Sequence, residues 1–129
     1  MYSIGLGLKL LPGRYDGYRK AHDESWPDLL ENLRSHRVSM VIYRSGDRLF
    51  VHATAPSEAQ WLATREGPRN DEWNRYMSEF LETDSGGDFV FEELEMAFSF
   101  GEFKSGDQHM GRKNPRSTRL RLHRRFALR

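Results

Sequence analysis

Residues 1 to 103 are predicted to form one α+β domain, and residues 104 to 129 a basic tail. Two apolar patterns alternate along the first part, one with a period of two, typical of strands, and one with a period of three to four, typical of helices. The charges divide at the same boundary. Residues 1 to 103 hold 11 Lys and Arg against 18 Asp and Glu, whereas residues 104 to 129 hold 9 against 1. With 129 residues and 37% hydrophobic composition, two domains would be crowded.

The first strand is predicted over residues 3 to 11. One face carries Ile4, Leu6, Leu8 and Leu10, and the other carries Gly5, Gly7 and Lys9. Glycines within a strand let another backbone or a ligand approach closely. Gly5-x-Gly7 does not continue into a dinucleotide-binding loop, because Leu10 stands where that motif needs its third glycine.

A long helix is predicted from about Tyr15 to His36, where apolar residues recur at helical spacing. Pro27 lies inside this segment. An interior proline loses its amide hydrogen bond and clashes with the carbonyl four residues earlier, here that of Asp23. We therefore expect a kink near Asp23, and His22 then lies beside an interrupted backbone.

The alternative is a fresh helix start after a break. In that case Ser25 is the N-cap, Pro27 lies in the first turn, and Asp28 completes a Ser-x-x-Asp capping box. The sequence leaves both alternatives open, and both place His22 next to the interruption.

The middle of the chain predicts a β-hairpin, with strands at Val38 to Tyr43 and Arg48 to Ala55 joined by a polar turn that contains Gly46. A short helix then begins at Pro56 and Ser57 and runs to about Arg65. A further helix begins at Gly67-Pro68, and its apolar stripe comprises Trp73, Tyr76, Met77, Phe80 and Leu81. The last strand is expected at about Leu94 to Phe100, where apolar residues alternate.

The predicted order is therefore β-α-β-β-α-β, which is the ferredoxin-like arrangement of an antiparallel four-stranded sheet with its helices on one face. The other face is left uncovered although several strands place apolar residues on it. Association of two such sheets would bury this surface, so we expect a homodimer.

Composition excludes several classes of function. The chain has no cysteine, so disulfides, thiolate catalysis and thiolate-bound metals are excluded. Its five histidines show no metal-ligand spacing, and we expect neither a metal nor a cofactor. The sequence has no signal peptide and no apolar run long enough to span a bilayer, which favours a cytoplasmic protein with no membrane association.

The candidate site residues are Tyr18, His22 and Trp26, spaced by four, which a regular helix would place on one side with the imidazole between two aromatic rings. Such an arrangement suits a sugar ring. Spacing alone favours the simpler interpretation that the aromatic residues are core and His22 is a partly buried histidine. The same holds for Trp73. Its place in the apolar stripe favours a core residue, and a wall that stacks against a sugar ring is the second interpretation.

These residues carry a resemblance to the L-rhamnose mutarotase family. The matching pattern is Tyr18-x3-His22-x3-Trp26-Pro27-x-Leu29, followed by Ile42-Tyr43, by Trp73-x-x-Tyr76-Met77, and by Glu93-Leu94. The resemblance implies a dimeric α+β barrel and a cofactor-free enzyme that interconverts the α and β anomers of a 6-deoxyhexose. It also implies that His22 is the general acid and base, and that Tyr18 and Trp73 bind the monosaccharide.

The sequence departs from the family pattern at two pocket positions. Met40 stands where the family usually has a tyrosine, and Asn74 where it has a second tryptophan. Both departures affect which sugar is preferred. The basic tail has no counterpart in the family pattern, and we expect it to be flexible and without a catalytic role.

Two other classes of function are weighed. A dimeric sugar-binding or regulatory module on the same fold would use the same residues without turnover, since a fold alone does not decide function. A nucleic-acid binder rests on the charge of the tail alone, and the acidic body argues against it.

Overall fold

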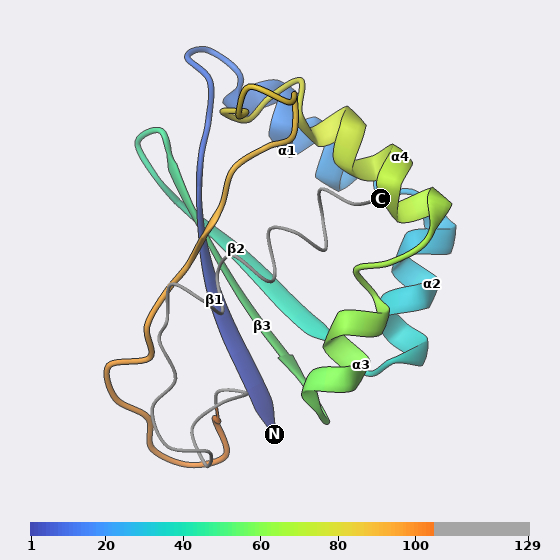
Figure 1. Ribbon diagram of the computed structural model, residues 1–129, viewed down its shortest axis with the longest axis vertical. Coiled ribbons are helices and arrows are strands. Elements are labelled where there is room, and N and C mark those ends of the chain that lie inside the picture. Colours follow the sequence, from blue (N-terminus) through green and yellow to red (C-terminus); the bar gives the residue numbers. More distant parts are fainter. Residues whose placement is uncertain (105–129) are drawn as a thin grey trace.

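The computed structural model describes residues 1–104 and places all helices on one face of a four-stranded sheet (Figure 1). The predicted basic tail lies outside the described residues except for Lys104. The elements are β1 (Tyr2–Lys9), α1 (Tyr15–Asp23), α2 (Pro27–Ser35), β2 (Ser39–Ser45), β3 (Arg48–Ala55), α3 (Glu58–Ala63), α4 (Pro68–Met77) and β4 (Glu92–Glu93). The strand order is β2-β3-β1-β4, with antiparallel pairing throughout. The predicted ferredoxin-like α+β arrangement is confirmed.

The core lies between β1, β3 and the helices. Leu6 pairs with Val51, and Leu8 with Leu49, so their side chains share the face that the helices cover. The alternation predicted for the first strand is confirmed, because the residues of its apolar face are all buried. The opposite side of β1 presents Gly5 and Gly7, which add no side chain to the other face of the sheet. None of the helices in the described part of the chain reaches the length and apolarity that a membrane crossing needs.

The segment from residue 15 to residue 36 forms two helices, which confirms the fresh start after a break and not the kink. The proposed cap is wrong, however. Trp26 is the N-cap of α2, in an extended conformation, because the residue before a proline is disfavoured in the helical region. The hydroxyl of Ser25 instead donates a hydrogen bond to the carbonyl of His22, at the end of α1.

The hairpin and the two helices that follow it form where the sequence predicts, but α4 ends at Met77, so Phe80 and Leu81 of the predicted stripe lie beyond the helix. Gly46 lies in the turn with positive φ, which glycine adopts without strain. Ser57 caps α3 by accepting a hydrogen bond from the backbone amide of Gln60. Pro68 lies in the first turn of α4, where its missing amide hydrogen costs nothing.

The last predicted strand, Leu94 to Phe100, is wrong. β4 is two residues long and pairs with Leu6 and Gly7, and the amide of Leu94 makes one further bond to the carbonyl of Gly5. The remaining edge of β1 is taken by a later residue, because the amide of Ser3 donates to the carbonyl of Lys104 at 2.7 Å. The intervening segment therefore leaves the sheet.

Gly17 provides a test of the packing between α1 and the segment after α4. A Cβ added there would lie 2.7 Å from a ring carbon of Phe80, which is buried. We expect Gly17→Ala to lower the free energy of unfolding by about 1–2 kcal/mol, because the overpacking penalty outweighs the gain in helix propensity. Urea unfolding followed by circular dichroism measures this.

Gly7→Ala is the matched control, since its Cβ would meet other atoms only at ordinary contact distances near 3.7 Å. A Gly17→Ala protein more stable than the wild type would contradict this account of the packing.

Candidate active site

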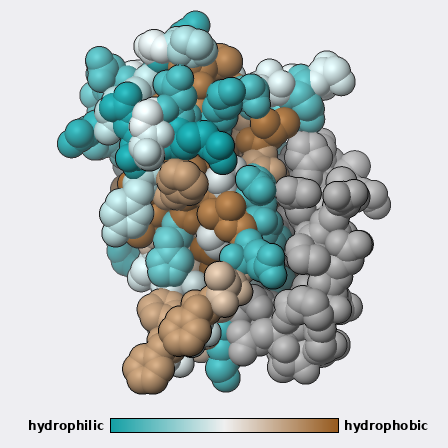
Figure 2. Space-filling model, turned by 90° about the vertical axis from the view of Figure 1, so that its left-hand side faces the viewer, coloured by the Kyte–Doolittle hydropathy of each residue, from teal (hydrophilic) through white to brown (hydrophobic). Residues whose placement is uncertain are grey.

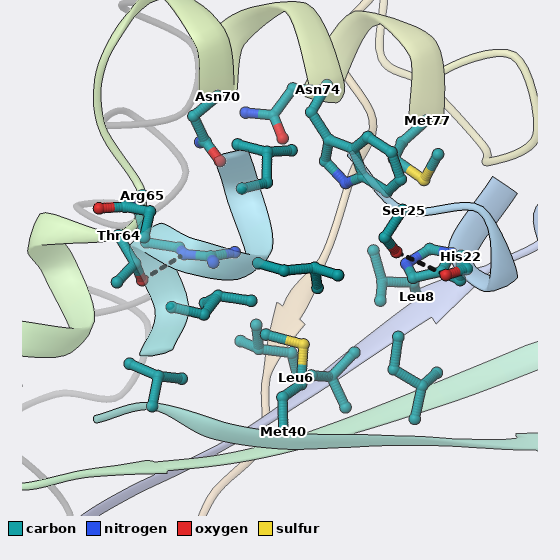
Figure 3. Close-up of a pocket in the computed structure, with 18 of the residues that line it drawn as sticks. Leu6, Leu8, His22, Ser25, Met40, Thr64, Arg65, Asn70, Asn74 and Met77 are labelled. Carbon is teal, nitrogen blue, oxygen red and sulfur yellow. Dashed lines mark hydrogen bonds between the residues drawn. The ribbon is translucent and has the colours of Figure 1, made fainter. Parts of the chain in front are cut away.

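A cavity of about 520 Å³ lies between the sheet and the helices. Its floor comes from β1 and β2, and its walls come from the helices (Figure 3). Three of the predicted site residues, Tyr18, His22 and Trp73, line it. The volume falls within the range of about 300–1,000 Å³ that is usual for small-molecule sites.

His22 lies in the last turn of α1, and one of its two ring nitrogens is already engaged. Nδ1 is 3.1 Å from the backbone carbonyl oxygen of Tyr18, one turn earlier. A carbonyl can only accept, so Nδ1 carries the proton and donates it. In the neutral imidazole Nε2 is therefore the nitrogen with a free lone pair, available to a bound molecule.

Burial lowers the pKa of His22 from its ordinary value of 6.5. The hydrogen bond to the Tyr18 carbonyl and the charge of Asp23 act in the opposite direction but do not outweigh the loss of solvation. At neutral pH the imidazole is therefore mostly uncharged and can accept a proton.

The imidazole packs between two aromatic rings, but they are not the pair that the spacing predicts. Its centroid lies 4.4 Å from that of Tyr18 and 5.3 Å from that of Trp73, which meets it edge-on. The prediction that Trp26 flanks His22 is wrong, because α1 ends at Asp23 and the four-residue spacing is not continued. Trp26 instead packs against Trp73 and lies outside the cavity lining.

Tyr18 is buried, and burial raises the pKa of its hydroxyl well above the ordinary value. The phenol therefore stays protonated. It keeps one O–H donor and its acceptor lone pairs, which can serve a polar ligand in the cavity. Its ring also contacts the ring of Phe80 edge-on, with the two centroids 6.5 Å apart.

Both departures from the family pattern lie in this cavity. Met40 is on the helix-covered face of β2, paired with Ala53, and Asn74 projects from α4. Figure 3 shows Met40 at the sheet side and Asn74 at the helix side.

Sequence reasoning missed several polar residues of the lining, and Arg65 and Asn70 are two of them. Asn70 is buried on α4, one turn before Trp73, and this helical spacing from a site candidate is the signal that could have found it. Arg65 follows α3 in a connection, where no periodicity applies. Within residues 1–104 no three His, Asp or Glu side chains cluster in a way that could hold a metal ion.

The chain is similar to known proteins of one family. The family model described as L-rhamnose mutarotase matches residues 3–116. The L-rhamnose mutarotase of Burkholderia orbicola is 31% identical over 101 residues, which cover 76% of this chain and 97% of the relative. That of Clostridium beijerinckii is 30% identical over 95 residues, covering 71% and 91%.

A solved structure shares the fold. The crystal structure of L-rhamnose mutarotase from Formosa agariphila aligns with a TM-score of 0.65 at 22% identity, covering 77% of this chain and 98% of that chain. The match spans nearly all of the solved chain, so the arrangement of sheet and helices is common to both.

The lowered pKa of His22 gives a prediction for titration. We expect its imidazole to titrate with a midpoint below 6.5, because burial disfavours the charged form. The chemical shift of its ring protons against pH measures this, and the signal is assigned by its absence in His22→Gln. A midpoint above 6.5 would show that the ring is not desolvated.

The sign of the linked stability follows. Protonation is less favourable in the folded than in the unfolded chain, so the contribution of His22 is complete above pH 6.5 and is lost as the pH falls through the folded-state pKa. The urea midpoint should therefore drop from pH 7 to pH 5 by less in His22→Gln than in the wild type.

Proposed function

Because the chain belongs to the L-rhamnose mutarotase family, we propose that it interconverts the α and β anomers of a 6-deoxyhexose such as L-rhamnose. His22 is the proposed general acid and base, and Tyr18 and Trp73 are the proposed sugar contacts. One observation supports the assignment most strongly. His22 lines the cavity, and its Nδ1 donates a hydrogen bond to the carbonyl of Tyr18, so Nε2 is the nitrogen that can accept a proton from a bound sugar.

The reaction needs two proton transfers and no electron transfer. A base takes the proton of the anomeric hydroxyl, an acid delivers a proton to the ring oxygen, and the bond between C1 and the ring oxygen breaks to give the open aldehyde. Rotation about the C1–C2 bond exposes the other face of the carbonyl, and the same steps in reverse close the ring. The products differ from the reactants only in configuration at C1.

His22 suits this cycle because it accepts a proton when neutral and returns it when charged. A positioned acid or base typically contributes ~10²–10⁴-fold. The uncatalysed reaction already proceeds in water, so a larger acceleration is not required, and the proposed mechanism uses no metal or cofactor. We place the enzyme in the cytoplasm, in keeping with a cysteine-free chain.

A homodimer is also proposed, joined through the sheet face that the helices leave open. Tyr43 is 63% exposed, and Phe98 and Phe100 are 84% and 86% exposed. Figure 2 shows apolar side chains gathered on this side of the molecule, with the largest group protruding at its lower edge. Large exposed aromatic groups of this kind are typical of a surface that a partner covers, and a second copy of the sheet would cover it.

Replacement of His22 tests the catalytic assignment. We expect His22→Ala to abolish accelerated anomer exchange while the protein still folds. Tyr18→Phe should cost about 1 kcal/mol, roughly fivefold in rate, because one neutral hydrogen bond is lost and the ring still packs. Saturation-transfer NMR between the α and β anomeric protons measures both.

His36→Ala is the matched control. His36 also places Nδ1 against the carbonyl one turn earlier, that of Asn32 at 2.9 Å, but it does not line the cavity. Unchanged accelerated exchange in a folded His22→Ala protein would exclude His22 as the general acid and base, whereas a wild type that binds the sugar without accelerating exchange would favour the binding module.

The dimer is tested by mass in solution. Light scattering should report about twice the 15.2 kDa of one chain. Tyr43→Lys should shift the equilibrium toward the monomer, since it places a charge on the proposed interface. A wild-type protein that is monomeric and fully active at micromolar concentration would exclude this assembly.

A further inference from the structure

Arg65 is a charged residue in the cavity that the proposed mechanism does not use. It follows α3, and its guanidinium enters the cavity from the end opposite to His22 (Figure 3). The residue keeps partial exposure because it borders the open space of the cavity. A ligand that reaches from His22 across the cavity would meet this guanidinium.

The contacts of Arg65 do not neutralise its charge. Its Nε donates to the hydroxyl of Thr64 at 3.2 Å, and its guanidinium carbon lies 4.4 Å from the ring centroid of Trp61. No carboxylate of residues 1–104 forms an ion pair with it. Arg69, four residues later, shows the contrast, because it pairs with Asp28 at 2.8 Å on the surface.

Burial lowers the pKa of Arg65 to about 10, so the guanidinium stays charged at neutral pH. Buried charges are ordinarily paired, since desolvation without a partner is unfavourable. The Arg65 guanidinium therefore lacks an anionic partner within residues 1–104, and a bound anion would supply one.

Two amides extend the same polar region. Asn70 and Asn74 project from α4 into the cavity lining, as Figure 3 shows. The side-chain nitrogen of each is buried and has no hydrogen-bond partner in the described part of the chain. Buried polar groups are nearly always paired, so these two donors also call for an acceptor. A guanidinium and two amides together offer donors to oxygen atoms.

We propose that the Arg65 end of the cavity binds a carboxylate carried by the sugar, so that the preferred substrates are aldose acids of the hexuronate class. This inference rests on the anomer exchange of the proposed function, but it replaces the 6-deoxyhexose as preferred substrate by the acid with the same ring. A hexuronate and the matching 6-deoxyhexose share the same ring and differ at C6, which is a carboxylate in one and a methyl group in the other. The hemiacetal end, where His22 acts, is unchanged.

The charge count favours a carboxylate over a phosphate. A guanidinium binds a carboxylate through two parallel hydrogen bonds and matches its single charge. A phosphate monoester carries close to two negative charges near neutral pH. The second arginine of the lining, Arg34, is exposed and paired with Glu31. The Arg65 guanidinium alone would leave the phosphate partly uncompensated within a body that holds 18 acidic and 11 basic residues.

The experiment compares sugars that differ only at C6. The pairs are D-fucose with D-galacturonate, 6-deoxy-D-glucose with D-glucuronate, and D-rhamnose with D-mannuronate, with D-galactose 6-phosphate as the phosphate probe. Anomer exchange at low sugar concentration is measured for the full chain. We expect at least one acid to exchange about tenfold or more faster than its neutral partner, as a charge-assisted hydrogen bond predicts.

Variants of Arg65 test whether the preference for the acid depends on its guanidinium. Arg65→Gln should bring the ratio of acid to neutral exchange close to one. Arg65→Lys should give an intermediate ratio, because it keeps the charge but not the paired donors. Arg75→Gln is the control, since it removes the same charge from an exposed position of α4 and should leave the ratio as in the wild type. Circular dichroism verifies that each variant folds.

Several outcomes would overturn the proposal. They are the absence of an acid preference in all three pairs, a preference that survives Arg65→Gln, and faster exchange of the phosphate than of D-galacturonate. Titration calorimetry of the same sugars separates this proposal from the proposed function. Acid binding that depends on Arg65 without any exchange would overturn the mutarotase and uphold the carboxylate site, and exchange of neutral sugars without acid preference would do the reverse.

Discussion

The geometry of the cavity depends on one backbone constraint, the proline at the start of α2. Pro27 forces Trp26 into an extended conformation, so a single helix from residue 15 to residue 36 cannot form. α1 therefore ends directly after His22, whose carbonyl is bonded by Ser25 and whose ring is held by the carbonyl of Tyr18. A continuous helix would have aligned Trp26 with His22, and the break gives that place to Trp73 from α4.

The cavity is chemically asymmetric as a result. One end holds a neutral imidazole between aromatic rings. The other holds a guanidinium and two amide nitrogens that have no hydrogen-bond partner among residues 1–104. Apolar side chains of β1 and β2 separate the two ends, among them Leu6 and Met40. A matching ligand would exchange protons with His22 at one end and carry a negative charge at the end that meets Arg65. The residues matched to the family pattern, Tyr18, His22 and Trp73, lie at the first end, and Arg65 and Asn70 lie at the second.

Sequence reasoning predicted the order of elements and the core face of β1, because periodicity acts over one or two turns. It also named five residues that line the cavity, namely Tyr18, His22 and Trp73 with the pocket positions Met40 and Asn74. It failed where partners are distant in the chain. The strand expected at residues 94 to 100 alternates correctly, but the edge it would pair with is already bonded to Lys104. Arg65 was missed because it lies in the connection after α3, where no periodicity applies.

The bridge between Lys104 and the start of β1 has a consequence for solubility. The exposed edge of a sheet can recruit a strand from another molecule and so begin aggregation. β4 covers the middle of the outer edge of β1. Near the beginning of β1, the carbonyl of Lys104 accepts a hydrogen bond from the amide of Ser3. A chain cut before this residue would present an unpaired strand terminus. The Lys104 carbonyl therefore occupies an edge amide of β1 that would otherwise be open to a strand of another molecule.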